Sequence, residues 1–592
     1  MWSVLLACAP YEPPEGALLA TYDVDGALTT FPDDLHTVDA DTVTGLAVKL
    51  QDGALTALAD TLPPGVLLVP ALESLDGFGL NGAIQLAFEG PIDPARFVPH
   101  LGDLESGTER PVSVQWTSDG QTVVLQPMFP LEAVHSYGVL VTDVFDATGA
   151  EVWPPADLWD LLHGKRKDDA RFARLHPRYR TLLDVAGVDE DAVDAATVFT
   201  TQSIHEQDDA VMDALDDAPP TISGFVCADE GTGFRRCEGV LHATRFVGDS
   251  GTVEAAADGV PSAKGSYDVP VSVWLPGVSG DPLPLVIYGH GMGGDRGEAN
   301  GYARDQASVG FVVASIDAPY QGDHPLATHS GTLLTTLDFF GVDISNVAMD
   351  VAQLRDHFRV AAWDKEQLVR AFRAARDVDG DGVDDLDGRV AYAGHSQGAI
   401  MGVQLLGMDP TVESAELSCG GARVSDIVHS GSQFQILVDM MRPSGVTEDD
   451  LLTFFPILQA AIDRGDPGSY ATAAREGDRD FLLQMVMNDD TVPNSTNEYL
   501  ARALHVDLGP PAERSIDGVD ELASLPASAN DDGRTAVMFQ FSQMMSDDGT
   551  LVPASHGFIH DNEVSVPQIR EFWRSRLDDG RAVVINPWTT LP

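Results

Sequence analysis

Lysine is scarce in this chain of 592 residues, which carries 35 basic and 92 acidic side chains. Arginine supplies most of the positive charge, and the lysines are Lys49, Lys165, Lys167, Lys264 and Lys365. The formal net charge of −57 would repel a phosphate backbone, so the composition argues against nucleic-acid binding. Because the acidic residues are spread along the whole chain and not gathered in a tail, they indicate a solvated acidic surface.

Long apolar runs and cysteines are also few. No apolar run is long enough to span a bilayer, and no Cys and His residues have the spacing of a zinc site. Cys227 and Cys237, two of the four cysteines, bracket a turn-rich loop between two strand-like segments. We expect a disulfide that closes this hairpin if the protein is exported, with two independent thiols as the alternative. Cys419 has no evident partner in the sequence.

Residues 1–19 contain Leu5-Leu6-Ala7-Cys8, which resembles the box at which bacterial lipoproteins are cleaved and lipidated on Cys. The preceding residues lack a basic side chain, and their apolar run is shorter than the roughly 7–15 residues of a usual signal core. We interpret the segment as a truncated lipoprotein signal, and an ordinary buried N-terminal segment is the alternative. The first interpretation predicts an extracellular or cell-surface protein that is anchored to the membrane by a lipid on Cys8.

The first part of the chain is expected to be rich in β-structure. Between residues 20 and 150, short stretches of alternating apolar and polar residues are separated by Gly, Asp and Pro turns, as in an antiparallel sandwich. Phrases such as Ala147-Thr148-Gly149 resemble bacterial Ig-like modules, which implies a spacing or shielding role. Residues 151–219 carry helical patterns and are expected to be a connector. Strands and helices alternate over residues 220–592, which predicts a mostly parallel sheet flanked by helices.

Gly394-His395-Ser396-Gln397-Gly398 is the most informative motif of the chain. It follows the apolar run 389–393 and precedes the helical stretch 399–406, so it predicts a tight turn between a strand and a helix, with Ser at its apex. Such a turn strains the backbone of Ser396 and needs Gly on both sides, because a side chain there would collide with the neighbouring elements. The partners described next favour a nucleophilic serine over an ordinary Gly-rich loop.

A second Gly-rich loop, 290–294, follows the buried-strand pattern of residues 283–289. Backbone N–H groups in such a loop can turn toward a developing oxyanion, because no side chain blocks the approach. We assign the oxyanion donors to the backbone N–H groups of Met292 and of Gln397, the residue after the nucleophile. Taken by itself, the loop fits a plain turn equally well.

The acid and the histidine of a triad are expected downstream of the serine, in that order. A buried-strand pattern runs into Asp489 and Asp490, and Asp489 is favoured because a proline follows it by four residues. Of three later histidines, His505 ends an amphipathic helix, which leaves His556 and His560. The glycine next to His556 allows a loop to present its imidazole, so we favour His556 as the general base.

Together these features resemble the α/β-hydrolase superfamily over roughly residues 220–592. Within it, segments such as Asp317–Gly322 and Asp466–Ala471 resemble bacterial extracellular or surface lipases of the virulence-factor type. The chain departs from that type at Gln397-Gly398-Ala399, where those lipases more often have Leu-Gly-Gly. The resemblance implies an esterase or lipase with a Ser396, Asp489 and His556 triad, a small-molecule or lipid ester substrate, and no cofactor required for catalysis.

Two other functions are compatible with the same sequence. A serine peptidase or polyester depolymerase would use the same residues, since a fold does not dictate its substrate. A surface adhesin would keep the hydrolase domain only as a non-catalytic relic. Residues 432–465, which are strongly apolar, are expected either to form a cap that lines an acyl-chain pocket or to be ordinary packing helices.

The segment before the nucleophile strand follows the first nine positions of a calcium-binding loop, with oxygen ligands at Asp377, Asp379, Asp381, Val383 and Asp385. The twelfth position holds Gly388 in place of a bidentate glutamate, so the affinity should be modest. A structural Ca²⁺ that rigidifies the approach to the nucleophile strand is one interpretation. A chance match in an Asp-rich chain is the other.

Overall fold

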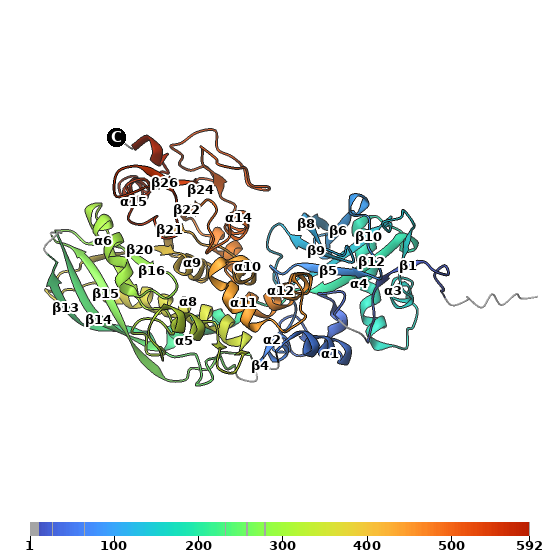
Figure 1. The fold of residues 1–592 in the computed structure, drawn as a ribbon. Helices are drawn as coiled ribbons and strands as arrows, with labels where there is room; N and C mark the ends of the chain where they lie inside the picture. The colour runs from blue at the N-terminus through green and yellow to red at the C-terminus, as the bar shows by residue number, and fades with distance from the viewer. Residues whose placement is uncertain are drawn as a thin grey trace, which may run out of the picture. The chain divides into compact units, whose positions relative to one another are not determined.

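The computed structural model describes residues 11–25, 28–63, 65–230, 233–255, 259–277 and 280–590. The chain forms two compact units, and Figure 1 colours it along its length. The N-terminal unit comprises residues 1–64, 69–203 and 442–461, and the C-terminal unit comprises residues 65–68, 204–441 and 462–592. The predicted lipoprotein box lies outside the described residues. Within them, no helix combines the length and the apolarity that a membrane crossing needs.

The N-terminal unit is built on two sheets. One has the order β11 (Val152–Trp153), β1 (Leu18–Thr21), β5 (Ile84–Phe88), β9 (Thr122–Pro127), β8 (Val112–Trp116). The other has the order β12 (Val193–Thr200), β10 (Ser136–Thr142), β6 (Pro99–Asp103), β7 (Thr108–Arg110). Neighbouring strands are antiparallel except β1 and β11. The β-rich N-terminal region predicted from the alternating pattern is confirmed.

Helix α4 (Ala170–Ala186) covers the second of these sheets. Its buried residue Leu182 shares one apolar core with Leu140 of β10 and Val198 of β12. Of the segment 151–219, expected as a helical connector, residues 151–203 lie in this unit and supply both a strand and a helix to its core. The remaining elements of the unit include β2 (Thr37–Asp39), β3 (Leu46–Val48), α1 (Asp52–Thr61), α2 (Leu68–Leu72) and α3 (Ala156–Leu162).

The C-terminal unit contains a ten-stranded sheet. Its order is β13 (Thr221–Asp229), β14 (Phe234–Thr244), β15 (Ser266–Pro276), β17 (Val312–Ile316), β16 (Leu283–Gly289), β20 (Leu386–His395), β21 (Val412–Ser418), β22 (Asp480–Val486), β24 (Ala536–Phe541), β23 (Asp507–Leu508). The strands from β13 to β17 pair antiparallel, and every pair from β17 to β23 is parallel. This mostly parallel sheet with an antiparallel edge confirms the predicted α/β-hydrolase fold class.

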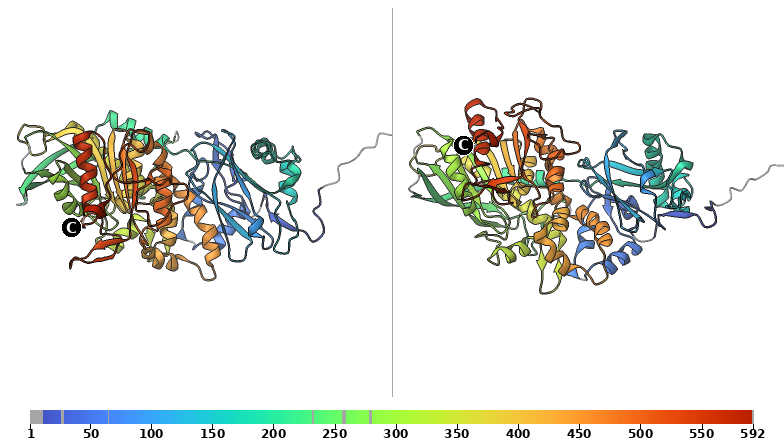
Figure 2. Two further views of the ribbon diagram at one scale, coloured as in Figure 1. Left: turned by 90° about the horizontal axis from the view of Figure 1, so that it is seen from above. Right: turned by 45° about the horizontal axis from the view of Figure 1, so that its top comes forward.

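Helices pack on both faces of this sheet (Figure 2). Helices α6 (Ala299–Ser308) and α15 (Val566–Asp579) share a core with Ala391 and Ala393 of β20. Tyr392, between those two alanines, lies against α9 (Gln397–Met408) on the opposite face, because successive strand residues alternate in direction. Other elements of the unit are β4 (Gly65–Val66), α5 (Glu206–Asp217), α7 (Thr332–Phe339), β18 (Val342–Asp343), β19 (Ala348–Met349), α8 (Val351–Ala374), α10 (Val424–Ser430), α13 (Ala471–Glu476), α14 (Asn494–Ala503), β25 (Gln543–Met545) and β26 (Leu551–Pro553).

The apolar segment 432–465 divides between the two units. Helix α11 (Gln435–Met441) stays with the C-terminal unit, whereas most of α12 (Glu448–Ile462) belongs to the N-terminal unit. There the backbone N–H of Ser118 donates a hydrogen bond to the Asp449 carboxylate at 2.8 Å. Much of the apolar stretch that the sequence offered as a cap or as packing helices therefore belongs to the N-terminal unit.

Candidate active site

Ser396 sits on a sharp turn between β20 and α9, with φ 55° and ψ −119°. A positive φ is unfavourable for a residue with a side chain, so the surrounding packing must hold this conformation. A Cβ atom on Gly398 would lie 2.0 Å from the carbonyl oxygen of Gly289 on the neighbouring strand. At Gly394 it would lie 2.6 Å from the backbone of Gly398. The turn thus needs glycine on both sides of Ser396, as the sequence predicted.

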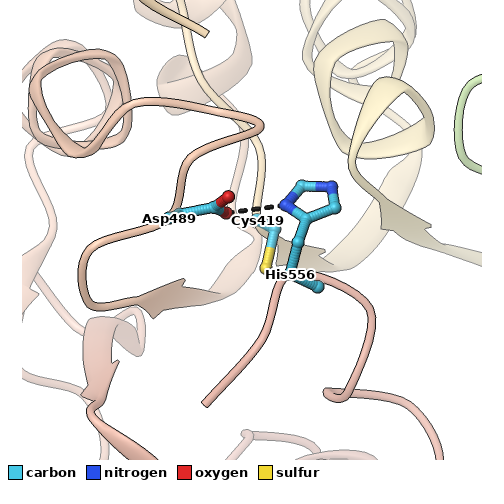
Figure 3. A group of neighbouring side chains, drawn as sticks. All are labelled: Cys419, Asp489 and His556. Atoms are coloured by element: carbon cyan, nitrogen blue, oxygen red, sulfur yellow. Dashed lines mark hydrogen bonds and ion pairs between the residues drawn. The ribbon is translucent and has the colours of Figure 1, made fainter. Parts of the chain in front are cut away.

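Asp489 lies just beyond the carboxyl end of β22, and His556 lies in the loop between β26 and α15. The His556 Nδ1 atom is 2.6 Å from the Asp489 Oδ2 atom (Figure 3). The other carboxylate oxygen accepts hydrogen bonds from the backbone N–H groups of Thr491 and Val492. These contacts fix the buried carboxylate against the imidazole. Asp490, the alternative acid, is exposed.

The two candidate histidines differ in their free nitrogen atoms. His556 Nε2 is buried and has no hydrogen-bond partner among the described residues, and His556 lines the same cavity as Ser396. His560 has both nitrogens engaged, since Nδ1 lies 3.0 Å from the Tyr288 hydroxyl and Nε2 lies 3.1 Å from the Glu416 carboxylate. Only His556 therefore has a ring nitrogen open for a proton from the serine. The third candidate, His505, follows α14 and does not line this cavity.

In the loop after β16, the backbone N–H group of Met292 differs from those of its two neighbours. The N–H of Gly291 donates to the Glu298 carboxylate at 3.1 Å, and the N–H of Gly293 donates to Gln321 Oε1 at 2.8 Å. Within residues 291–293 of the described chain, Met292 is the residue whose N–H has no such acceptor. Gln397 is the first residue of α9, where helix N–H groups lack intrahelical acceptors. These are the two donors that the sequence predicted for an oxyanion.

Gln321 joins the two elements that carry these donors, a feature that sequence reasoning missed. Its Nε2 donates to Gln397 Oε1 at 2.8 Å while its Oε1 accepts from Gly293. The side chain is completely buried. In the sequence, residues 317–322 were notable only for the family resemblance. The contact between Gln321 and Gln397 could not be predicted, because two glutamines so far apart in the chain form no local pattern.

A second polar network, also missed, lies beside the nucleophile. His395 Nε2 donates to the backbone carbonyl of His556 at 2.9 Å, and its Nδ1 lies 3.7 Å from Glu298. Burial alone would raise the pKa of Glu298, but the imidazole of His395 outweighs it and lowers the pKa to about 2. Burial would lower the pKa of His395, and Glu298 raises it instead. Both shifts favour a charged Glu298–His395 pair.

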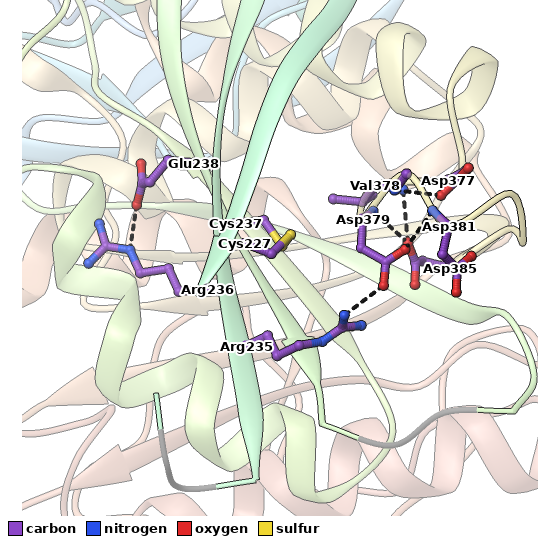
Figure 4. The surroundings of a disulfide bond; sticks show 11 residues. Cys227, Arg235, Arg236, Cys237, Glu238, Asp377, Val378, Asp379, Asp381 and Asp385 are labelled. Atoms are coloured by element: carbon purple, nitrogen blue, oxygen red, sulfur yellow. Dashed lines mark hydrogen bonds and ion pairs between the residues drawn. A yellow bond between two sulfur atoms is a disulfide. The ribbon is translucent and has the colours of Figure 1, made fainter. Parts of the chain in front are cut away.

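The predicted calcium loop is partly assembled. Carboxylate oxygens of Asp377, Asp379 and Asp385 lie within 4.8 Å of one another, and Asp379 also forms an ion pair with Arg235 at 2.6 Å (Figure 4). Asp381, outside that group, accepts a hydrogen bond from the backbone N–H of Val383, whose side chain is exposed. Three of the five predicted ligands are thus brought together.

Cys227 and Cys237 face each other across the β13–β14 hairpin and are joined by a disulfide bond (Figure 4). The pairing is a direct cross-strand one, at the edge of the ten-stranded sheet. Cys419 is buried and is the one free thiol of the described residues. Its Sγ donates to the backbone carbonyl of His556 at 3.4 Å, so it lies directly beneath the histidine loop.

No protein-family model and no curated protein sequence matches this chain. Among solved structures, acetyl xylan esterase 1 from Thermoanaerobacterium sp. is 16% identical over 60% of this chain and 89% of its own, with a TM-score of 0.35. A glucuronoyl esterase from Teredinibacter turnerae is 13% identical over 60% and 78% of the two chains, at a TM-score of 0.33. The acylaminoacyl peptidase of Pyrococcus horikoshii is 12% identical over 61% and 50%, at 0.32.

Proposed function

We propose that this protein is a serine hydrolase that cleaves carboxylic esters through an acyl-enzyme. The observation that carries the proposal is the open Nε2 atom of His556, held by Asp489 in the same cavity as a serine on a strained turn. A nucleophile, a base and an acid that orients the base are the minimum set for this chemistry.

In the proposed reaction, Ser396 Oγ attacks the ester carbonyl carbon while His556 Nε2 takes its proton. Asp489 stabilises the imidazolium that forms, and the N–H groups of Met292 and Gln397 donate to the negatively charged oxygen. The bond to the leaving alcohol then breaks as His556 returns the proton to the alcohol oxygen. Water repeats the sequence on the acyl-enzyme, releases the carboxylic acid and restores Ser396.

A serine peptidase or polyester depolymerase would use the same groups, and a non-catalytic adhesin would use none of them. The adhesin is disfavoured because a strained serine beside an open imidazole has a cost in stability without a return in binding. We retain three further proposals from the sequence, namely a kinship with virulence-factor-type lipases, an extracellular or surface location with a lipid on Cys8, and a structural Ca²⁺.

A fluorophosphonate probe tests the proposed function, because only an activated serine reacts with it. Wild-type protein should be labelled on Ser396 and should hydrolyse p-nitrophenyl acetate. Ser396→Ala should lose labelling and reduce the rate by on the order of 10⁴–10⁶, with an unchanged melting temperature. Ser430→Ala, an exposed serine at the end of α10, is the control. Activity of Ser396→Ala within tenfold of wild type would overturn the assignment.

A further inference from the structure

Most of the residues that line the cavity beside Ser396 carry a polar side chain. Its volume is about 480 Å³, and among the described residues that line it Met292 is the one with an aliphatic side chain. Apart from the proposed catalytic residues and glycines, the others are Tyr288, Glu298, Tyr302, His395, Gln433, Thr491, His560 and Asp561. The proposed reaction uses none of these side chains directly.

One side of this cavity is a connected network, which we call the polar wall: Tyr288, Glu298, His395 and His560. The Tyr288 hydroxyl donates to Glu298 at 3.2 Å and lies 3.0 Å from His560 Nδ1. His560 in turn contacts the fully buried Glu416, and His395 lies beside Glu298. Because each polar group holds the next, the wall is rigid before any substrate arrives.

An alkyl chain gains little from such a wall. Burying a CH₂ group against apolar surface contributes about 0.8 kcal/mol. Here the chain would instead cover the partly exposed Glu298 carboxylate without offering it a hydrogen bond, which is unfavourable. A hydroxyl group can instead donate to the partly exposed Glu298 carboxylate. Sites built for hydrogen bonding discriminate strongly against ligands that lack the matching groups.

The charges of the lining side chains restrict the class of ligand further. The carboxylate of Glu298 is paired with His395. It can therefore accept a hydrogen bond from a ligand, but it adds little net negative charge to the cavity. Asp561, at the exposed part of the lining, has no ion pair among the described residues that balances it. An anionic ester is therefore disfavoured, while one exposed carboxylate is a weak basis for selecting a cation.

Building on the proposed function, we propose that the polar wall binds the hydroxyl-rich alcohol half of the substrate. The preferred ester then joins a short acyl group to a polyol or sugar. The sequence resemblance left the acyl-chain length open, between a small-molecule and a lipid ester, and this proposal selects the short acyl group.

The test compares four esters by titrating the acid released at constant pH. Glycerol monoacetate should give a kcat/KM at least tenfold above those of pentyl acetate, which lacks the hydroxyls, and of glycerol monooctanoate, which lengthens the acyl chain. It should also exceed acetylcholine, the cationic acetate. A higher kcat/KM for any of the other three overturns the subsite. If no ester is hydrolysed and the fluorophosphonate probe does not react, the proposed function itself has failed.

Two variants locate the preference in the cavity lining, one in the polar wall and one at Asp561. Tyr288→Phe removes only the bridging hydroxyl and should lower the ratio of kcat/KM for glycerol monoacetate to pentyl acetate about tenfold. Asp561→Asn, at an exposed position of the cavity lining, should lower the same ratio severalfold. Glu563→Gln, an exposed acid just outside the cavity lining, should leave the ratio unchanged. An unchanged ratio in both Tyr288→Phe and Asp561→Asn contradicts the proposal.

Discussion

His556 is held from two directions. Asp489 binds the Nδ1 side of its ring, and His395 and Cys419 both donate to its backbone carbonyl. The ring and its loop are therefore fixed separately, which keeps Nε2 in place while no described residue forms a hydrogen bond to it. Pre-organisation of this kind removes an ordering step from the reaction.

The acid and base assignments predict two ranked pairs of variants. Asp489→Asn should lower kcat on p-nitrophenyl acetate by on the order of 10⁴, because the imidazole loses its orienting acceptor, whereas Asp490→Asn should have little effect. His556→Ala should likewise cost far more than His560→Ala. Melting temperatures of all four separate catalysis from folding, since His560→Ala leaves the buried Glu416 without that partner.

The opposite ranking of the two histidine variants would change the assignment of the general base. If His560→Ala keeps its melting temperature and loses far more activity than His556→Ala, the Glu416–His560 pair would be the catalytic one. The open nitrogen on His556 would then have no catalytic meaning.

At the scale of elements, the oxyanion site depends on the spacing between the loop after β16 and the start of α9. Gln321 sets that spacing, since it contacts both. It touches no reacting atom in the proposed mechanism, so it is a positioning residue.

Gln321→Leu, which fills the site without hydrogen bonds, is predicted to lower kcat about tenfold to a hundredfold with little change in KM. Loss of an oxyanion donor itself typically costs about 10²–10³. Affinity for a trifluoromethyl ketone, which mimics the tetrahedral intermediate, should fall in proportion to kcat. Gln404→Leu, an equally buried glutamine further along α9, is the control. If KM rises by the same factor by which kcat falls, or if the affinity for the ketone is unchanged, Gln321 would be a purely structural residue.

The calcium loop gives the second prediction at this scale. Ca²⁺ should raise the melting temperature and chelator should lower it, since a ligand at a hundred times its Kd adds about 2.7 kcal/mol to a folded state that alone binds it. Asp379→Ala should abolish the difference and Asp384→Ala, an exposed neighbour, should not. Because Arg235 pairs with Asp379, Arg235→Ala should strengthen the response. Identical melting curves with and without chelator would leave these carboxylates as solvated loop charges.

Local patterns were enough to predict the elements that carry the site. The pattern of eighteen consecutive residues, 389–406, was enough to predict the strand, turn and helix around Ser396. The expected order of serine, acid and histidine pointed to Asp489 and His556, whose side chains are in contact in the structure. The polar wall and Gln321 had no such signal, because their partners meet only through the sheet. The same holds for α12, whose apolar residues fit a cap as well as they fit an ordinary packing helix.

At the scale of the whole molecule, the disulfide secures an exposed edge. Strand β13 is the outermost strand of the ten-stranded sheet and pairs on one side only. Edge strands are the parts of a sheet that separate most readily and pair with other chains. A covalent link between β13 and β14 keeps this edge closed.

Reduction of the Cys227–Cys237 bond is therefore predicted to lower stability before turnover. A cross-link that closes a short loop contributes roughly 2–4 kcal/mol, and it lies on the sheet edge away from β20. Dithiothreitol should lower the melting temperature of wild type but not of a Cys227→Ser, Cys237→Ser double variant. Free alkylation of both cysteines in unreduced protein from its native source would refute the bridge and weaken the proposal of export.

The position of Cys419 allows the opening of the histidine loop to be measured through the reactivity of its thiol. Its thiol is 0% exposed beneath His556, and its pKa is raised by burial, so an alkylating reagent reaches it only when the loop lifts. In a Cys8→Ser background, the rate of modification of this single free thiol counts those openings directly. A substrate or covalent inhibitor that binds against His556 should lower the rate of Cys419 modification. The motion of the loop then becomes measurable without a label near the reacting atoms.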